Sequence, residues 1–343
     1  MANSKPSVLL IYTGGTIGMM QDARTSELKP FNFKALSKQI PELEKFDIDL
    51  TTISFKHPID SSNMNLKVWV EIADIINFNY QKHDGFVILH GSDTMSYTAS
   101  ALCVMLEILS KPVILTGSQL PIGIIRTDGK ENLITAIEIA AAQKNKKPIV
   151  TEVCVYFEYK LYRGNRTYKY NSAHFDAFKS PNYPALAEAG VDIQYHSSAL
   201  LKPSKKVLSV HRQLDNDIAV LKLFPGLSKK NTLSILNTPG VKAVIIETFG
   251  AGNASTEDWF ISALKKAINK GIIIYNVTQC AEGKVIQGMY ETSSALKKIG
   301  VVSGYDITFE SAITKLMFVL GQKVSVSKAK QLLETNLRGE ITI

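Results

Sequence analysis

Short apolar runs rich in β-branched residues alternate along this chain with segments whose apolar residues recur at helical spacing. Such runs are typical of strands buried on both faces. In the first half they lie at 8–12, 86–90, 113–116 and 153–157, with helical patterns near 68–76, 102–109 and 128–143. Strand–helix–strand alternation predicts a parallel sheet covered by helices on both faces.

The alternation stops at a polar stretch and then starts again. Residues 195–217 have no apolar period, and we expect a linker there. Further strands are predicted at 218–224, 241–247 and 272–277, with helices at 257–269, 309–320 and 327–337. The length of 343 residues fits two domains. We therefore predict a two-domain α/β protein: a larger N-terminal domain with a mostly parallel sheet flanked by helices (1–194), and a smaller C-terminal α/β domain (218–343).

Charge and cysteine content narrow the choice of partners and compartment. The net charge of +8 (39 − 31) is scattered, and the lysine clusters at 144–147 and 202–206 contain no aromatic residues, so we expect solvated loops and no nucleic-acid partner. Cys103, Cys154 and Cys280 are far apart and form no CxxC pair, which suits a reducing compartment. No apolar stretch reaches the length of a membrane span. We predict a cytoplasmic protein with no membrane partner.

Three of the predicted strands end in turns that combine glycine with hydroxyl side chains. The turns are Thr13-Gly14-Gly15-Thr16, His90-Gly91-Ser92-Asp93-Thr94 and Thr116-Gly117-Ser118-Gln119. Since the carboxyl ends of parallel strands lie side by side, we expect the turns to converge on one crevice. We expect the glycines to adopt positive φ and to let backbone N–H groups approach a ligand. Hydroxyls, N–H donors and a carboxylate suit the binding of an amino acid and acyl transfer.

The same turns are also compatible with simpler structural roles and with other ligands. Ser92 and Asp93 are common helix N-cap types, and a TGGT run is usually an ordinary turn. Nucleotide binding fits less well, because residues 14–18 lack the G-x-G-x-x-G spacing and no strand is followed by GK[ST]. There is also no G-x-S-x-G elbow. The six histidines show no H-E-x-x-H spacing, so we expect no metal.

Four motifs occur in order along the first half of the chain: TGGTIGM (13–19), ILHGSDTMSYTASAL (88–102), TGSQLP (116–121) and LYRGNRTYK (161–169). Together they resemble the bacterial L-asparaginases, and most of all their cytosolic type I branch. The resemblance continues through FDAFKSPNYP, FGAGN, TQCAEGKV and NLRGE, so it extends over nearly the whole chain. A collinear set of this length is far more specific than any one of its motifs.

The resemblance implies hydrolysis of L-asparagine to L-aspartate and ammonia, with no metal or organic cofactor. It implies that Thr16 is the nucleophile that forms an acyl-enzyme, and that Ser92, Lys169 and Asp93 form the second catalytic group. A threonine hydroxyl needs activation by a neighbouring base, and a lysine beside a carboxylate and a hydroxyl could take part in such a relay. Without the resemblance, Lys169 would be interpreted as a surface lysine.

Substrate contacts are implied for a second set of residues. Asp60 and Ser61, in the run PIDSSNM, together with Ser92 and Asp93 would hold the α-amino and α-carboxylate groups of asparagine. Asp60 is about equally well explained as a turn or N-cap residue.

The sequence departs from the family pattern at two catalytic positions. Ser92 replaces the usual second threonine and keeps its hydroxyl. Many relatives carry a tyrosine on the loop after the nucleophile, where this chain has Leu28. Tyr305 is a candidate replacement, although an ordinary tyrosine at a strand end explains it equally well. The polar loop 20–30 is expected to close over the site as a lid.

The family also implies an assembly and, in some members, regulation. We expect a homodimer or homotetramer in which Asn253 of one subunit completes the site of another, although a Gly-Asn turn explains this residue as well. Some type I enzymes bind asparagine near the cysteine that corresponds to Cys280. Relatives carry Arg and Thr at the positions of Glu247 and Tyr168, and a reversed charge argues against the same regulation here.

Three alternatives remain. A glutaminase-asparaginase of broader specificity differs by one methylene of substrate, which a pocket discriminates by only about 1–3 kcal/mol. A non-catalytic amino-acid-binding relative is suggested by the missing loop tyrosine. The tRNA-dependent amidotransferase subunit is disfavoured, because it needs a further N-terminal domain and the first strand here is expected to begin at Val8.

Overall fold

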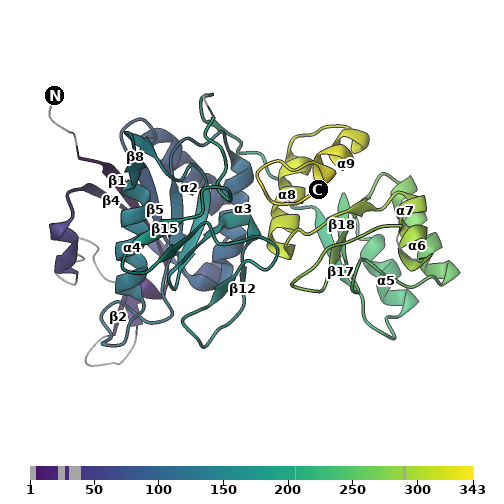
Figure 1. Cartoon of the computed structure of the whole chain (residues 1–343). Helices are drawn as coiled ribbons and strands as arrows, with labels where there is room; N and C mark the ends of the chain where they lie inside the picture. The colour runs from purple at the N-terminus through teal and green to yellow at the C-terminus, as the bar shows by residue number, and fades with distance from the viewer. Residues whose placement is uncertain (1–4, 22–27, 31–39, 205, 289–290) are drawn as a thin grey trace. The chain divides into compact units, whose positions relative to one another are not determined.

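The computed structural model describes residues 5–21, 28–30, 40–204, 206–288 and 291–343 (Figure 1). The chain divides into two compact units, Met1–Arg212 and Gln213–Ile343. Each unit contains its own sheet with its own helices. This confirms the predicted two-domain α/β fold class.

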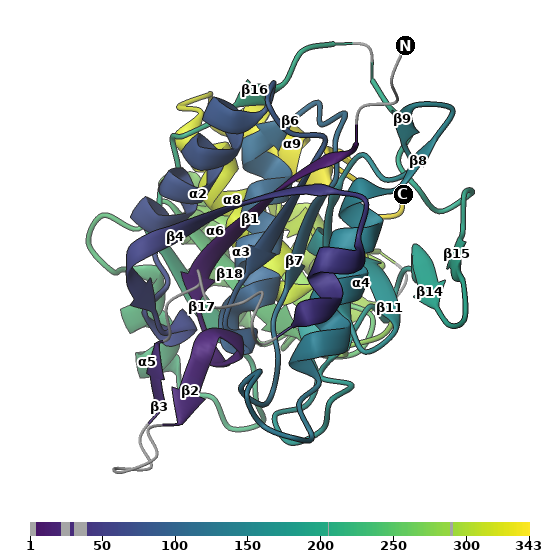
Figure 2. The same ribbon diagram turned by 90° about the vertical axis from the view of Figure 1, so that its left-hand side faces the viewer.

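The N-terminal unit is built on an eight-stranded sheet of order β15-β14-β11-β10-β7-β5-β1-β4. Neighbouring strands from β10 to β4 are parallel, and β11, β14 and β15 are attached antiparallel. The strands are β1 (Ser7–Gly14), β4 (Asp49–Ile59), β5 (Gly85–Leu89), β7 (Val113–Thr116), β10 (Val153–Phe157), β11 (Lys160–Arg163), β14 (Ala187–Ala189) and β15 (Ile193–Tyr195). The four predicted strands are confirmed, and the prediction lacked β4, which lies alongside β1 (Figure 2).

Helices cover both faces of this sheet, as the alternation predicted. The helices are α2 (Leu66–Asn79), α3 (Met95–Met105) and α4 (Gly129–Ala141). On one face, Leu10 and Leu89 share a core cluster with Leu133 and Ile137 of α4. Helices α2 and α3 pack against each other on the opposite side (Figures 1 and 2). Asn65 caps α2 by accepting hydrogen bonds from the amides of the first turn.

Several short elements complete the N-terminal unit. They are β2 (Met19–Gln21), β3 (Leu28–Pro30), β6 (Leu106–Glu107), β8 (Gln143–Lys144), β9 (Lys147–Pro148), β12 (Tyr168–Lys169), β13 (Phe178–Lys179), β16 (Ser209–Val210), and the 3₁₀ helices η1 (Thr16–Gly18), η3 (Pro41–Lys45), η4 (Ser61–Asn63), η5 (Ser92–Thr94) and η6 (Gly164–Arg166). Within the stretch where we expect a linker, β16 pairs with β6, and His211 lies 2.8 Å from Glu107. These contacts attach the last residues of the N-terminal unit to the segment that directly follows α3 in the same unit.

The C-terminal unit has a four-stranded parallel sheet of order β17-β18-β19-β20. Its elements are β17 (Ile218–Lys222), α5 (Lys229–Leu236), β18 (Ala243–Thr248), α6 (Asp258–Asn269), β19 (Ile273–Thr278), α7 (Glu291–Ile299), β20 (Val302–Ser303), α8 (Phe309–Gly321) and α9 (Val326–Glu334). Val244, Ile246 and Ile274 form a core with Phe260 and Leu264 of α6. The predicted helix end at Leu337 is wrong, because the Leu337 amide donates to the Glu340 carboxylate instead of continuing the helix.

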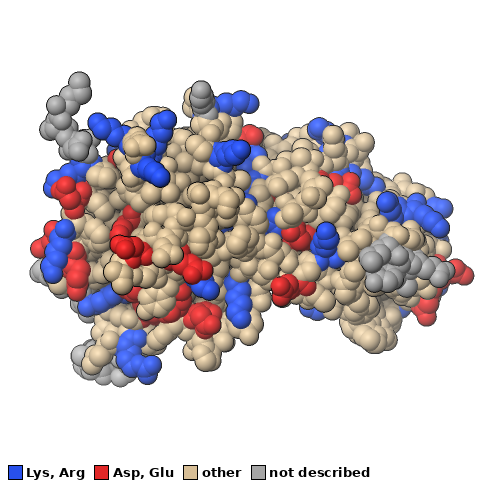
Figure 3. All heavy atoms as spheres, in the orientation of Figure 1, with Lys and Arg blue, Asp and Glu red and all other residues tan. Residues whose placement is uncertain are grey.

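Charges of both signs are interspersed on the face of the molecule in Figure 3, and no continuous basic stripe covers it. In the part of the chain that is described, none of the helices has the length and apolar character needed to cross a bilayer.

A buried ion pair holds the chain end in the C-terminal unit. Lys315 Nζ lies 2.7 Å from Glu340 Oε1, and the two side chains are 0% and 1% exposed. Lys315 also donates to the carbonyls of Leu333 and Thr335. Burial by itself would raise the pKa of Glu340, but Lys315 and the amides of Leu337 and Arg338 hold that pKa below its usual value. The closing NLRGE motif is therefore a structural anchor.

We expect Lys315→Met to lower the free energy of unfolding by about 3–5 kcal/mol, because it leaves the Glu340 carboxylate buried without its cation. Adding Glu340→Gln should recover part of the loss. Lys242→Met is the matched control, since Lys242 pairs with Asp215 and Asp217 at a site where its side chain is 51% exposed. Chemical denaturation measures all three; equal effects of Lys315→Met and Lys242→Met would contradict this interpretation.

Candidate active site

The register of the parallel strands brings the three glycine turns together. In β1, Gly14 pairs with Ile59 at the end of β4, and Tyr12 pairs with Leu89 at the end of β5. Leu89 in turn pairs with Thr116, the last residue of β7. The segments that begin at Asp60, Thr16, His90 and Gly117 therefore leave the sheet side by side, which confirms the predicted convergence.

The backbones of these turns are in direct contact. A Cβ on Gly15 would lie 2.5 Å from the Gly91 nitrogen, and one on Gly91 would lie 2.6 Å from Ser61 Oγ. A Cβ on Gly117 would lie 2.3 Å from the His90 carbonyl oxygen. Glycine is required at each position because no room exists for a side chain.

The expectation of positive φ holds for only one of the turns. Gly14 and Gly15 have φ of 136° and 88°. Gly91 has φ −67°, and Gly117 is absent from the positive-φ residues. For the latter two, the physical reason for glycine is close packing between turns and not backbone conformation.

Lys169, Ser92 and Asp93 meet at this edge of the sheet. Lys169 Nζ lies 2.7 Å from Ser92 Oγ and 2.6 Å from Asp93 Oδ1. The lysine side chain is 16% exposed, whereas Asp93 is 65% exposed and accessible to a ligand. The lysine side chain thus contacts a hydroxyl and a carboxylate at the same time.

The segment that carries Lys169 is positioned by helix α3. The 3₁₀ helix η6 packs on α3, where a Cβ on Gly164 would lie 3.0 Å from Ala99 Cβ. Thr167 Oγ1 lies 3.2 Å from Ser96 Oγ, one turn beyond Asp93. Because α3 begins directly after Ser92–Thr94, this packing returns β12 to the start of the helix.

Thr16 lies in a turn fixed from both sides. Thr13 Oγ1 donates to the Leu89 carbonyl at 2.9 Å, and the buried Tyr12 hydroxyl donates to the Gly18 carbonyl at 3.1 Å. The side chain of Thr16, the first residue of η1, is half-buried. Its turn contacts the Ser92 turn through Gly15 and Gly91.

Asp60 and Ser61 begin η4 beside the same edge. Asp60 accepts hydrogen bonds from Ser62 N and Ser62 Oγ at 2.9 and 2.8 Å, and these bonds lower its pKa. Thr94 Oγ1 donates to the Ser61 carbonyl at 2.7 Å, which ties η4 to η5. Asp60 therefore performs the N-cap role, and its exposed carboxylate also lies next to the turns.

Residues 7–201 match the family model "Asparaginase, N-terminal", and residues 217–333 match "Glutaminase/Asparaginase C-terminal domain". The chain belongs to the asparaginase family. It is 40% identical to L-asparaginase 1 of Escherichia coli (strain K12) over 98% of both chains.

Two further members show the range of the family. The crystal structure of L-asparaginase I from Vibrio cholerae has a TM-score of 0.89 at 40% identity, covering 99% of this chain and 100% of that one. The chain is also 38% identical to the 60 kDa lysophospholipase of Mus musculus, covering 98% of this chain and 62% of that protein.

Gln119 contacts Ser92 at this edge of the sheet, and the sequence analysis assigned it no role. Its Oε1 accepts a hydrogen bond from Ser92 Oγ at 3.1 Å, and its Nε2 donates to the His174 carbonyl. The backbone N–H of Gln119 donates to both carboxylate oxygens of Asp128. Burial raises the pKa of the Asp128 carboxyl. The place of Gln119 directly after the third strand turn was the signal that could have identified it.

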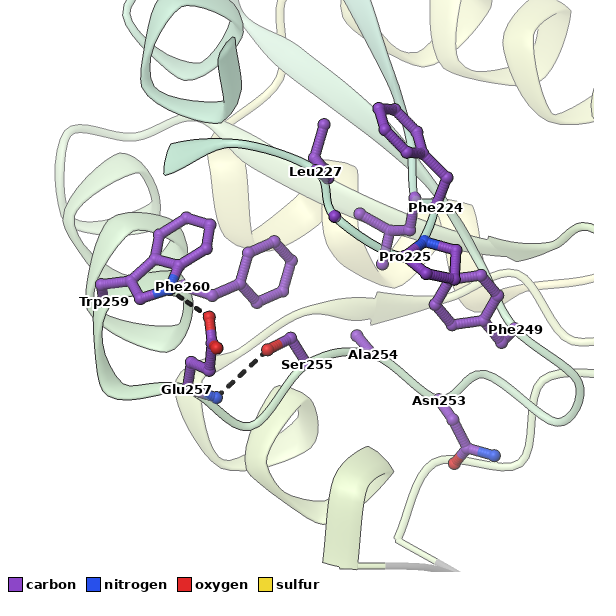
Figure 4. Close-up of a pocket in the computed structure, with 12 residues that line it drawn as sticks. Phe224, Pro225, Leu227, Phe249, Asn253, Ala254, Ser255, Glu257, Trp259 and Phe260 are labelled. Carbon is purple, nitrogen blue, oxygen red and sulfur yellow. Dashed lines mark hydrogen bonds between the residues drawn. The ribbon is translucent and has the colours of Figure 1, made fainter. Parts of the chain in front are cut away.

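Two other candidates lie in the C-terminal unit. Tyr305 follows β20 with φ 52°, and burial raises its pKa. Asn253 belongs to a tight turn in which its amide donates to Phe249 O at 2.8 Å. It lies at the rim of a pocket between the β17–α5 and β18–α6 loops, and in Figure 4 its side-chain amide points away from the aromatic rings. Both candidates thus belong to a different unit from Lys169.

The other predictions concern the expected lid, the expected regulatory site and metal binding. Residues 22–27, the middle of the expected lid, lie outside the described residues; Leu28 begins β3, which pairs with β2. In the C-terminal unit, Glu247 lies 3.6 Å from Lys222, and Cys280 is exposed. Among the described residues, no group of three His, Cys, Asp or Glu side chains could hold a metal ion.

We expect Gly15→Ala to lower stability more than Gly226→Ala. Both glycines have φ near 90° (88° and 87°), but Gly226 has nothing within 4 Å of the added Cβ, whereas Gly15 faces Gly91. The overpacking should add about 1–3 kcal/mol to the backbone strain that the two variants share. Equal losses in denaturant titrations would show that close contact between the turns has no energetic weight.

Proposed function

We propose that this protein is an L-asparaginase that hydrolyses L-asparagine to L-aspartate and ammonia. The observation that carries the proposal is the contact of Lys169 Nζ with both Ser92 Oγ and Asp93 Oδ1, beside the turn that holds Thr16. A protein that only bound an amino acid would need the carboxylate and hydroxyls but not this lysine. The 40% sequence identity to L-asparaginase 1 over 98% of both chains supports the same assignment.

In the first half of the reaction, Thr16 Oγ1 attacks the side-chain amide carbon of asparagine. The new C–O bond forms as the C–N bond breaks, and the threonine proton leaves with the nitrogen as ammonia. Negative charge on the amide oxygen would be stabilised by N–H groups of the glycine turns. The product is an aspartyl ester of Thr16.

In the second half, water attacks that ester. The Ser92 hydroxyl takes the proton of the attacking water as it passes its own proton to Lys169, which enters this step as the neutral amine. The ester bond breaks as Thr16 Oγ1 takes that proton back. The carboxylates of Asp60 and Asp93 suit the α-ammonium of the substrate, and hydroxyls such as Ser61 suit its α-carboxylate.

A broader glutaminase-asparaginase activity is the second candidate. The comparisons include a relative named for lysophospholipase activity at nearly the same identity as the asparaginase, so similarity alone does not fix the substrate. Glutamine differs from asparagine by one methylene, which the kinetics must resolve.

We further propose a cytoplasmic homo-oligomer, a dimer or tetramer. The exposed free thiol of Cys280 suits a reducing compartment. Around Asn253, Phe224 and Phe249 are 54% and 38% exposed, and exposed aromatic side chains are typical of protein–protein contacts. A second copy covering this surface would bring Asn253 to its active site.

We expect Thr16→Ala to abolish ammonia release from L-asparagine, and Lys169→Met to lower kcat by about 10²-fold or more through loss of the relay. Release is measured in parallel from L-asparagine and L-glutamine. Mass spectrometry of a rapidly quenched mixture should find the aspartyl group on Thr16 in the wild type.

Lys179→Met is the matched control for Lys169→Met. Lys179 lies on β13, the strand paired with β12, and stacks on the Tyr170 ring outside the relay. The Lys179→Met variant should retain wild-type kcat. An acyl group on any other residue, or asparagine binding without ammonia release by the wild type, would overturn the proposed function.

Mixed oligomers test whether Asn253 acts across subunits. We expect Asn253→Ala and Thr16→Ala to be impaired separately, and a mixture refolded together to regain activity, because hybrids contain one intact composite site. A mixture no more active than its components would place Asn253 outside the site.

A further inference from the structure

A continuous chain of hydrogen bonds runs through the core beneath the Ser92 turn. Trp69 Nε1 donates to Thr98 Oγ1 at 3.0 Å, Thr98 Oγ1 lies 2.8 Å from His90 Nε2, and His90 Nδ1 lies 2.7 Å from the Gly91 carbonyl oxygen. His90 and Thr98 are 0% exposed, and Trp69 is 6% exposed. The chain ends on the peptide group that precedes a proposed catalytic residue.

The groups at the two ends of this hydrogen-bond chain determine which partner donates in every bond. The Trp69 indole can only donate, and the Gly91 carbonyl can only accept. His90 Nδ1 must therefore carry a proton. Burial lowers the pKa of His90 to about 4, so the ring is neutral at pH 7 and Nε2 is left bare to accept from Thr98. One tautomer satisfies all the contacts.

The bond to Gly91 fixes more than a carbonyl group. The peptide unit is planar and trans, so the Ser92 N–H points opposite to the Gly91 C=O. Ser92 is the first residue of η5, and its N–H therefore has no acceptor within that helix. Gly91, at the N-cap, provides no side-chain cap that would hold the plane otherwise. The His90 imidazole bonds to the carbonyl side of this peptide.

We propose that His90 is a positioning residue for the hydrolytic site: through Nδ1 it holds the Gly91–Ser92 peptide so that the Ser92 N–H and hydroxyl face the reacting amide. The proposal rests on the proposed asparaginase function. His90 itself touches no substrate. A hydrogen bond at the carbonyl also polarises the peptide and strengthens its N–H as a donor.

An apolar residue could fill the same volume without this effect. The imidazole is completely buried, and burial of a polar ring is unfavourable unless both nitrogens are bonded. Here both nitrogens are bonded, and the remote partners, Thr98 and Trp69, lie on α3 and α2. Two helices thereby fix the tautomer that the Ser92 turn needs.

Two substitutions of His90 test its bond to Gly91 and its bond to Thr98 separately. In His90→Asn the side-chain amide nitrogen occupies the place of Nδ1 and can still donate to Gly91, while the Thr98 contact is lost. In His90→Gln the polar group lies at the place of Nε2 and can bond Thr98, while a methylene faces Gly91. Both variants replace the ring by a neutral amide, and the Asn side chain is one methylene shorter than that of Gln.

We expect kcat of His90→Gln for asparagine to fall roughly 10²-fold with KM changed less than about threefold, as for a displaced oxyanion donor. His90→Asn should retain kcat within about tenfold of the wild type. His83→Gln is the matched control: His83 is also buried, but it bonds Ser7 at the opposite end of β1, and kcat should not change. Denaturation midpoints show that each variant is folded in the assay.

A spectroscopic measurement tests the geometry without using activity. In protein labelled with ¹⁵N at histidine, His90 should show the Nδ1–H tautomer and no titration between pH 5 and 8. Thr98→Val removes the donor to Nε2, so the Nε2 resonance should shift, while the Nδ1–H tautomer should persist because the Gly91 carbonyl still accepts from Nδ1.

Failure of the role proposed for His90 and failure of the proposed asparaginase function give different results. If the wild type releases ammonia and His90→Gln matches it, or if both His90 variants lose kcat equally, the positioning role is wrong while the asparaginase function stands. An Nε2–H tautomer in the wild type also overturns it. If the wild type releases no ammonia from asparagine, the proposed function fails first, and the role assigned to His90 fails with it.

Discussion

The parallel register of β4, β1, β5 and β7 is the constraint on which the rest of the site depends. It pairs Gly14 with Ile59, Tyr12 with Leu89, and Leu89 with Thr116, so four segments leave the same edge of the sheet close together. The turns are then close enough that a Cβ between two of them would overlap backbone. Helix α3 extends this frame, because it starts at the second turn and guides the returning chain to Lys169. Ser92 and Lys169, the proposed catalytic residues, are distant in sequence and meet on this packed backbone frame.

Polar groups in the N-terminal unit are divided between an accessible layer and a buried one. Asp93 and Asp60 are exposed and able to meet a charged substrate, while Lys169 is mostly covered. Beneath them, His90, Thr98 and Asn132 are fully buried, with hydrogen-bond partners for each. Paired polar groups in a core have little freedom to rearrange, which keeps the turns above them in one geometry.

The sequence was sufficient to predict the buried strands of the parallel sheet and the turns that follow them. The strands of the parallel sheet are continuous apolar runs, and the glycine–hydroxyl turns follow them directly. It did not reveal β4, because that edge strand is largely exposed and has no apolar period, nor the antiparallel β11, β14 and β15, which are set by turns and tertiary contacts. Gln119 and His90 were quoted within motifs but not assigned, since their contacts exist only after β5 and β7 are paired.

The frame determines the class of reaction more strongly than it determines the substrate. Thr16, Ser92 and Lys169 are held by turns and by α3, and any acyl group that reaches Thr16 meets the same donors. Selectivity between amides that differ by a methylene depends instead on the walls of the pocket, where a single contact contributes about 1–3 kcal/mol. Relatives that are 40% and 38% identical to this chain carry different activity names. We therefore expect substrate preference in this chain to depend on the residues around the turns, and the proposed hydrolytic chemistry to depend on the turns themselves.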